Sequence, residues 1–285
     1  MINKMLCIIF LGIMAGLSPA RAQTAPSAVA RVKGQIVAAR VQGRVTAISK
    51  STKESRLLHD GDVVAEQTTI VTAPGASVIL AFSNGATVDI AGDSKLDVAE
   101  FEQDPFSTEL KASDIKQETG TSVTKLELTR GELVGRVAHL NVDKGSEFTV
   151  RTPVGAAGIR GTVLGVVFRP LENGEAHVEI ETFEGLLAFN PVGGDRVLVS
   201  AGLKFDALID YHPRDRESPW DWRPLKPPAA KLTSLSPQEA AAFQSELQNM
   251  LQVLQGLGFH LDSTNPPPPP APAPPALTPG AGSGP

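Results

Sequence analysis

Short runs in which apolar and polar residues alternate fill the middle of the chain, and they restrict its fold more than any other feature. Val88 and Ile90 alternate with Thr87 and Asp89. The same period of two recurs along the chain at Val78/Leu80/Phe82, Leu96/Val98, Leu126/Leu128, Phe148/Val150 and Val178/Ile180. This period sets one face of a strand against a core and the other in water. No stretch here keeps the period of a helix, so the sequence predicts an all-β domain over residues 33–205.

Dipeptides that favour turns separate these runs, at Asp60-Gly61, Pro74-Gly75, Asn84-Gly85 and Gly92-Asp93. Asn84-Gly85 lies between two apolar runs and predicts a hairpin. The glycines are unevenly spaced, so the pattern alone leaves a meander, a sandwich and a β-solenoid as alternatives. Residues 103–122 are polar and weakly patterned, and they predict an excursion on the surface.

The first 22 residues have the pattern of a secretory signal peptide. Lys4 precedes an apolar stretch over 5–17, and Ala20-Arg21-Ala22 fits the small-x-small cleavage pattern. Cleavage after Ala22 removes Cys7, the one cysteine of the chain, which suits an oxidising compartment. We therefore predict a protein that is periplasmic in a bacterium or secreted, with a linker over 23–32. An uncleaved N-terminal anchor is the alternative.

Charge and composition argue against two classes of protein. Lys and Arg number 26 against 31 Asp and Glu, and the resulting net charge of −5 does not attract nucleic acid. No apolar run reaches the roughly 20 residues that a spanning helix needs, so the protein is not expected to be integral to the membrane.

The sequence also lacks the common signatures of catalytic and metal sites. The mature chain has no cysteine, and neither Gly-x-Ser-x-Gly nor a phosphate loop occurs. The five histidines are scattered. The groups Asp60/Asp62 and Asp89/Asp93/Asp97 lack the spacing of a calcium loop, and Asp is a common turn residue. We therefore expect no enzyme, no bound metal and no cofactor.

Three motifs in the second half of the β region are notable for their order and spacing. Leu126-Glu127-Leu128-Thr129-Arg130-Gly131-Glu132-Leu133 is followed by Phe148-Thr149-Val150-Arg151-Thr152-Pro153 and then by Gly158-Ile159-Arg160-Gly161-Thr162. Together with segments 58–63, 70–72 and 76–88, they resemble a FecR-type domain over about residues 60–205. The resemblance implies a β-solenoid-like domain of stacked short strands that lies outside the inner membrane.

The resemblance further implies a signalling role. In complete FecR-type regulators the domain binds an outer-membrane transporter and transmits the state of that transporter to a cytoplasmic sigma factor. The present sequence shows only a cleavable signal before the β region, without the anti-sigma helical domain or an internal transmembrane helix. We therefore expect the extracytoplasmic binding module to be retained and the anti-sigma role not to be.

Arg160 is the one charged residue in an apolar stretch. We expect Gly158 and Gly161, on either side of it, to allow a tight turn where backbone passes close to backbone. The favoured interpretation of Arg160 is a partly buried guanidinium that binds carbonyl groups and a carboxylate, such as Asp89 or Glu127. The alternative is a guanidinium presented to the carboxylate of a partner.

After the β region, a polar linker over 206–235 contains both tryptophans. One of the two, Trp220 or Trp222, is interpreted as a clasp that packs back on the β-domain, with an exposed peptide-recognition patch formed by the pair as the alternative.

Residues 236–256 predict an amphipathic helix that begins with the capping box Ser236-Pro237-Gln238-Glu239. Its apolar stripe consists of Phe243, Leu247, Met250, Leu251 and Leu254. A lone helix of this length is marginal in water, so the stripe must be covered. We expect it to cap the open end of the β-stack, with a homodimer through the helix as the alternative. Residues 257–285, which include Pro266–Pro270, predict a disordered, proline-rich tail.

These features together predict an exported, non-catalytic binding or scaffold module of the bacterial cell envelope, whose β-domain recognises another envelope protein or a glycan. The alternative is a soluble component of FecR-type signalling, in transport or iron-responsive regulation, with the membrane span supplied by a partner. The candidate partner-binding residues are the Gly158–Thr162 motif, Trp220, Trp222, Phe243, Leu247 and Leu251.

Overall fold

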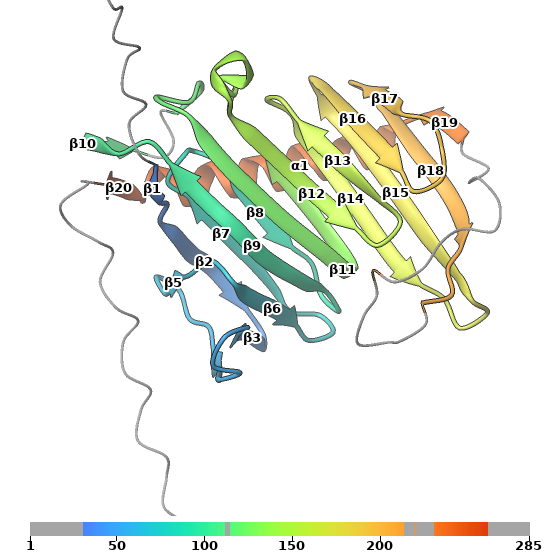
Figure 1. Ribbon diagram of the computed structural model, residues 1–285, viewed down its shortest axis with the longest axis horizontal. Helices are drawn as coiled ribbons and strands as arrows, with labels where there is room; N and C mark the ends of the chain where they lie inside the picture. The colour runs from blue at the N-terminus through green and yellow to red at the C-terminus, as the bar shows by residue number, and fades with distance from the viewer. Residues whose placement is uncertain (1–30, 112–114, 214–219, 221–230, 262–285) are drawn as a thin grey trace, which may run out of the picture. The chain divides into compact units, whose positions relative to one another are not determined.

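Two sheets, here named sheet A and sheet B, face each other across one apolar core. The computed structural model of the chain describes residues 31–111, 115–213, 220 and 231–261. In Figure 1 the strands follow one another in approximate chain order from the blue β2 and β3 to the orange β18 and β19. Within the described residues, the outermost strands of both sheets pair on one side only, so both sheets are open.

Sheet A is antiparallel except for the parallel pair β11–β12. Its strands are β1 (Val32–Lys33), β3 (Val45–Ser49), β4 (Ser55–Leu57), β6 (Thr68–Thr72), β9 (Lys95–Gln103), the first part of β11 (Ser122–Arg136), β12 (Glu147–Thr152), β13 (Gly155–Ile159), β16 (Leu186–Pro191) and β17 (Val197–Ser200).

Sheet B is antiparallel throughout. Its strands are β2 (Ile36–Gln42), β5 (Val63–Val64), β7 (Ser77–Phe82), β8 (Thr87–Ile90), the second part of β11, β14 (Val163–Pro170), β15 (Glu175–Glu184), β18 (Leu203–Asp210) and β19 (Lys231–Ser234). A short 3₁₀ turn, η2 (Val142–Lys144), precedes β12.

Beyond β11 the chain winds in hairpins that alternate between the two sheets. The hairpins β12–β13 and β16–β17 belong to sheet A, and the hairpin β14–β15 belongs to sheet B. The antiparallel pair β18–β19, whose strands are joined by a longer segment, also belongs to sheet B. Each hairpin also pairs with the next one in its own sheet, through β13–β16 and β15–β18. The predicted all-β domain of stacked short strands is therefore confirmed.

The core lies between the two sheets and follows the period of two in the sequence. In β15, for example, Val178 and Ile180 are fully buried, whereas the intervening Glu179 is not. Aromatic rings fill the space between the sheets, with Phe82 and Phe101 at 5.1 Å and Phe189 and Phe205 at 4.9 Å between centroids. Burying each such side chain contributes about 1.5–3 kcal/mol, so the inward-facing residues specify the register of every strand.

The predicted hairpin at Asn84-Gly85 is confirmed. It joins β7 to β8, and the Phe82 N–H donates to the carbonyl of Ala86 at 2.9 Å. Gly85 takes a φ of +86°, as the turn requires.

The helix α1 (Pro237–Gln255) begins with the predicted capping box. The Glu239 N–H donates to the Ser236 hydroxyl at 3.2 Å, and the Ser236 N–H donates to the Glu239 carboxylate at 2.6 Å. The helix packs on the outer face of sheet B, since Phe243 stacks on Phe183 of β15 at 5.8 Å and Leu254 packs with Val37 of β2. Figure 1 shows it running behind the strands.

The favoured expectation that this helix caps the open end of the β-stack is therefore wrong. The outer face of sheet B carries apolar side chains of its own, including Val37, Ala81 and Phe183, and an apolar stripe covers more area on such a face than on a sheet end.

Two segments differ from their predicted boundaries. Residues 258–261, expected to be disordered, form β20 (Gly258–Leu261), which pairs with β10 (Phe106–Lys111) in the predicted surface excursion. Burial of Phe259 against Val37 and Ala81 accounts for this order. The expected linker over 206–235 contains the end of β18 and the whole of β19.

Among the described residues, no helix is both long and apolar enough to cross a membrane. The predicted signal peptide over 1–22, Trp222 and the tail beyond 261 lie outside the described residues.

Candidate functional site: sheet corners and a free edge

The motif Gly158–Thr162 is the place where the chain passes from one sheet to the other. The strand β13 of sheet A ends at Ile159, and β14 of sheet B begins at Val163. At the corner, the Thr162 N–H donates to the carbonyl of Val137 at 3.1 Å, and the Val137 N–H donates to the carbonyl of Thr162 at 3.0 Å. Thr162 is buried, and its hydroxyl donates to the carbonyl of Leu186 at 3.3 Å.

Only one of the two motif glycines is required by a close approach. Gly161 has a φ of +108°, and a Cβ atom there would lie 2.7 Å from Nδ1 and 2.9 Å from Cα of His139. Gly158 lies within β13, and its nearest non-neighbouring atom would be 3.9 Å from an added Cβ. The expectation of backbone passing close to backbone therefore applies to Gly161 and not to Gly158.

Arg160 is exposed at this corner, so the favoured interpretation of a partly buried guanidinium is wrong. Among the described residues it makes no hydrogen bond or ion pair, and both expected carboxylates lie against other groups. Glu127 accepts a hydrogen bond from Arg151 at 3.0 Å, and Asp89 contacts Glu246 of α1. The corner needs a left-handed glycine rather than a buried charge. Recognition of a partner's carboxylate by Arg160 stays a prediction.

Gly131, predicted from the sequence only as part of a strand motif, marks a second corner. Here β11 leaves sheet A, where it pairs with β9, and enters sheet B, where it pairs with β14. Gly131 has a φ of +97°, and an added Cβ would lie 2.5 Å from the Cα of Ser94. A glycine inside a strand pattern is a known sign of such a bend and was the available signal.

The two ends of the stack present different strand edges. At the C-terminal end, β17 has the sequence Val197-Leu198-Val199-Ser200, without a charge, and Leu198 is 51% exposed. Leu186 on the neighbouring β16 is also exposed, at 46%. At the other end, the edge strand β4 spans three residues, of which Arg56 forms an ion pair with Asp62 at 2.7 Å.

Trp220 lies over the outer face of sheet A. The guanidinium carbon of Arg151, on β12, is 4.9 Å from the centroid of the Trp220 ring. Such a cation–π contact is worth about 0.5–1 kcal/mol at an exposed site. The contact agrees with the clasp interpretation for Trp220.

The helix residues predicted as partner contacts are taken up, in part, by the chain itself. Phe243 is 5% exposed and packs under the helix against sheet B, so it is not available to a partner. Leu247 and Leu251 are half-buried. The apolar stripe is therefore largely covered within one chain, which is why the fold of the helix does not require a second copy.

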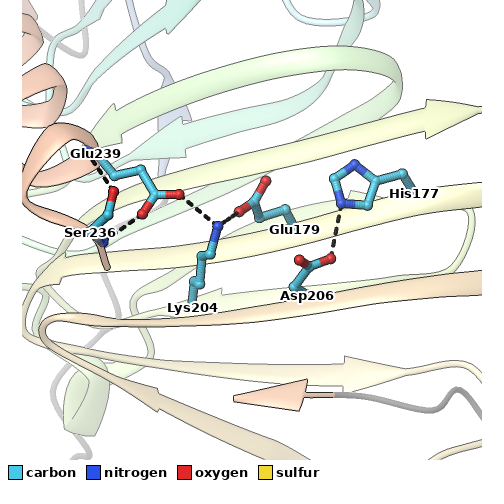
Figure 2. A network of polar contacts seen from close by, with 6 residues as sticks. All are labelled: His177, Glu179, Lys204, Asp206, Ser236 and Glu239. Atoms are coloured by element: carbon cyan, nitrogen blue, oxygen red, sulfur yellow. Dashed lines mark hydrogen bonds and ion pairs between the residues drawn. The ribbon is translucent and has the colours of Figure 1, made fainter. Parts of the chain in front are cut away.

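A charged network joins the start of α1 to sheet B (Figure 2). The Nζ atom of Lys204, on β18, lies 2.5 Å from a carboxylate oxygen of Glu179 on β15 and 2.7 Å from a carboxylate oxygen of Glu239 on α1. Farther along the same face, the Nε2 atom of His177 lies 3.0 Å from a carboxylate oxygen of Asp206. No pattern in the sequence predicts this network, because its members come from three separate elements.

The network shifts the pKa values of two carboxyl groups in opposite directions. Hydrogen bonds from Lys204 and from Ser236 lower the pKa of Glu239 to about 2. Burial and the nearby charge of Glu179 raise the pKa of Glu181 to about 7. Oxygens of Glu179, Glu181 and Glu239 lie within 4.8 Å of one another, a spacing that a metal ion would need, but the ammonium of Lys204 already contacts two of the three.

The aspartates considered as calcium ligands have other partners. Asp62 pairs with Arg56, Asp93 with Arg130 at 2.5 Å and Asp97 with Lys50 at 2.7 Å. The Val41 N–H donates to the carboxylate of Asp60 at 2.5 Å. The interpretation as turn residues fits Asp60, Asp62 and Asp93. It is wrong for Asp89 and Asp97, which lie within β8 and β9, and Asp97 is buried.

The fold and its corners define an open, two-sheet β-module made of stacked hairpins. Residues 68–188 match the family model described as FecR protein. The chain therefore contains a FecR domain, as its motifs predicted. The match includes both glycine corners.

A search of curated proteins finds no match. Two crystal structures of a protein from Parabacteroides distasonis ATCC 8503, described as a "putative anti-sigma factor", are similar at 12% identity. The first match covers 62% of this chain and 63% of that one with a TM-score of 0.39, so the chain spans less than two thirds of it. The second covers 65% and 74%, with a TM-score of 0.40.

Proposed function

We propose that the chain is a component of FecR-type signalling that acts outside the cytoplasm by binding another protein, and that it does so without catalysis. The presence of a FecR domain supports the signalling role. The predicted signal peptide supports the location, and the net charge of −5 makes a nucleic acid an unsuitable partner.

The observation that carries the proposal is the uncharged edge of β17, which pairs only with β16 among the described residues. An edge strand presents unpaired N–H and C=O groups, and proteins usually block such edges with charges or very short strands. The edges of β4 and β5, at the other end, are blocked in this way by their length and by the ion pair of Arg56. The edge of β17 is one residue longer than that of β4 and carries no charge over 197–200, and Leu198 and Leu186 lie beside it. A partner strand added there gains main-chain hydrogen bonds and apolar contact together.

The proposal is tested by crosslinking and by complementation. A photo-reactive residue at position 198 is expected to crosslink a partner in cells of the native host, whereas one at Leu57, 53% exposed on β4, is not. In a deletion strain, Leu198→Lys is expected to fail to restore the wild-type pattern of gene expression, and Leu57→Lys is expected to restore it.

Two results would count against this function. Equal crosslinking at both positions would remove the edge of β17 as the binding surface. A partner captured at position 198, together with unchanged gene expression in the deletion strain, would favour a scaffold of the cell envelope over signalling.

A further inference from the structure

A cavity of about 430 Å³ lies between helix α1 and the outer face of sheet B. Its floor includes Ser77 and Asp89, its helix wall includes Glu246 and Asn249, and Arg40 lies on the side of β2. The volume is within the range of about 300–1,000 Å³ that small-molecule sites occupy. The residues of the β17 edge are not part of it.

A pair of carboxyl groups lines this cavity and forms no ion pair with any of the described residues. The side chain of Asp89 forms a hydrogen bond with that of Glu246. Because a carboxylate only accepts hydrogen bonds, this contact requires a proton between the two groups. Burial and the contact with Glu246 raise the pKa of Asp89 to about 8, so the pair retains that proton at neutral pH. An ammonium group could take the place of the proton.

A guanidinium that forms no ion pair with any described residue lines the same cavity. Arg40 makes no hydrogen bond or ion pair within the part of the chain that the structure describes, although its charge opposes the rise in the pKa of Asp89. The other acid of the cavity, Glu132, is held by Arg169 at 2.7 Å. Arg40 lies at the irregularity of β2 between Ala39 and Gln42 with a φ of +49°. Such a backbone conformation costs energy and is often found at binding sites.

We propose that this cavity binds a small zwitterion, such as a free amino acid or a dipeptide with both termini free. The ammonium group of the ligand displaces the proton between Asp89 and Glu246, and its carboxylate pairs with Arg40. A ligand bound in this way bridges sheet B and α1 through opposite charges. The site is independent of the partner edge.

The proposal is tested by isothermal titration calorimetry of the full chain with alanyl-alanine at pH 7. We expect saturable binding and the release of a proton, which is seen as a difference in heat between two buffers of unlike ionisation enthalpy. The N-acetylated and C-amidated forms of the dipeptide are each expected to bind at least about tenfold more weakly, equivalent to about 1.4 kcal/mol.

Variants of the cavity and matched controls outside it locate the site. Asp89→Asn and Arg40→Gln are expected to weaken binding by about tenfold or more. Glu246→Gln, on the helix surface, serves in place of Asp89→Asn if that variant does not fold. Asp195→Asn and Arg44→Gln, both exposed and outside the cavity, are expected to bind as the wild type does.

The proposal is overturned if alanyl-alanine fails to bind at millimolar concentration, or if a blocked form binds as well as the free dipeptide. It is also overturned if the cavity variants bind as tightly as their controls, since binding would then occur elsewhere. Failure at this site would leave the crosslinking result at Leu198 unaffected.

Discussion

The Nζ atom of Lys204 lies 2.7 Å from a carboxylate oxygen of Glu239 and so joins strand β18 to the first turn of α1. The same carboxylate closes the capping box with Ser236, and the same ammonium contacts Glu179. One lysine therefore orients the start of the helix on sheet B, while Phe243, Met250 and Leu254 hold its apolar side by burial.

Replacing Lys204 with Met is expected to loosen the helix. The change keeps the aliphatic part of the side chain and leaves Glu179, Glu181 and Glu239 facing one another without a cation. We expect a loss of about 1–2 kcal/mol in the free energy of unfolding. Faster amide hydrogen exchange over 237–255 is expected to accompany it. Lys116→Met, at an exposed position, is the control; unchanged exchange in the helix would mean that the ion pairs do not hold it.

Replacing Glu181 with Gln is expected to stabilise the fold at high pH only. The pKa of Glu181 is raised to about 7 from its usual 4.5, so the folded state holds a proton that the unfolded state has lost. The stability that this group contributes is complete below pH 4.5 and is lost as the pH rises through about 7.

Glu181→Gln removes the cost of burying the charge, by an amount on the order of 2 kcal/mol at pH 8 and near zero at pH 4. Chemical denaturation at the two pH values measures the difference, with Glu172→Gln on an exposed turn as the control. Equal effects at both pH values would exclude titration of Glu181 as the cause.

Replacing Gly131 with Ala is expected to disrupt the corner of β11. The added Cβ would overlap Ser94, in addition to the strain of a positive φ, for a combined cost of about 3 kcal/mol or more. Gly75→Ala is the matched control, because Gly75 has a φ of +74° but open space around it. Gly75→Ala is expected to lower the free energy of unfolding by only about 1 kcal/mol. Thermal unfolding distinguishes the two, and similar losses would mean that strain alone, not the contact with Ser94, sets the requirement.

Replacing Arg160 with Ala is expected to change the free energy of unfolding by less than about 0.5 kcal/mol, because the residue is exposed and forms no hydrogen bond or ion pair among the described residues. Chemical denaturation measures this. A loss above about 2 kcal/mol would show that the side chain has a partner in the folded protein after all.

Replacing Phe243 with Ala is expected to weaken the packing of α1 without altering the oligomeric state. The loss of a buried aromatic ring costs about 3 kcal/mol. Size-exclusion chromatography with light scattering is expected to give the same mass as the wild type and as Gln244→Ala, an exposed neighbour. A dimer in the wild type that dissociates in Phe243→Ala would restore the helix as a dimer interface.

The sequence determined the class of the fold, the hairpin at Asn84-Gly85, the capped helix and the FecR motifs. Each of these depends on residues that are close together in the chain. The period of two in β15 predicts which side chains are buried, because successive side chains of a strand point to opposite faces. The capping box is likewise complete within four residues.

The tertiary structure alone decided what those elements contact. The stripe of α1 required a cover, but its position on sheet B depends on apolar side chains and on Lys204, which come from strands far away in sequence. The apolar neighbours of Arg160 in the sequence predict that its side chain is buried. In the structure the left-handed corner at Gly161 leaves Arg160 exposed. The pair Asp89–Glu246 joins residues separated by more than half of the chain. The local sequence pattern predicts which face of a helix or strand is apolar. The surface that covers this face depends on how the whole chain packs, because the covering residues come from distant parts of the sequence.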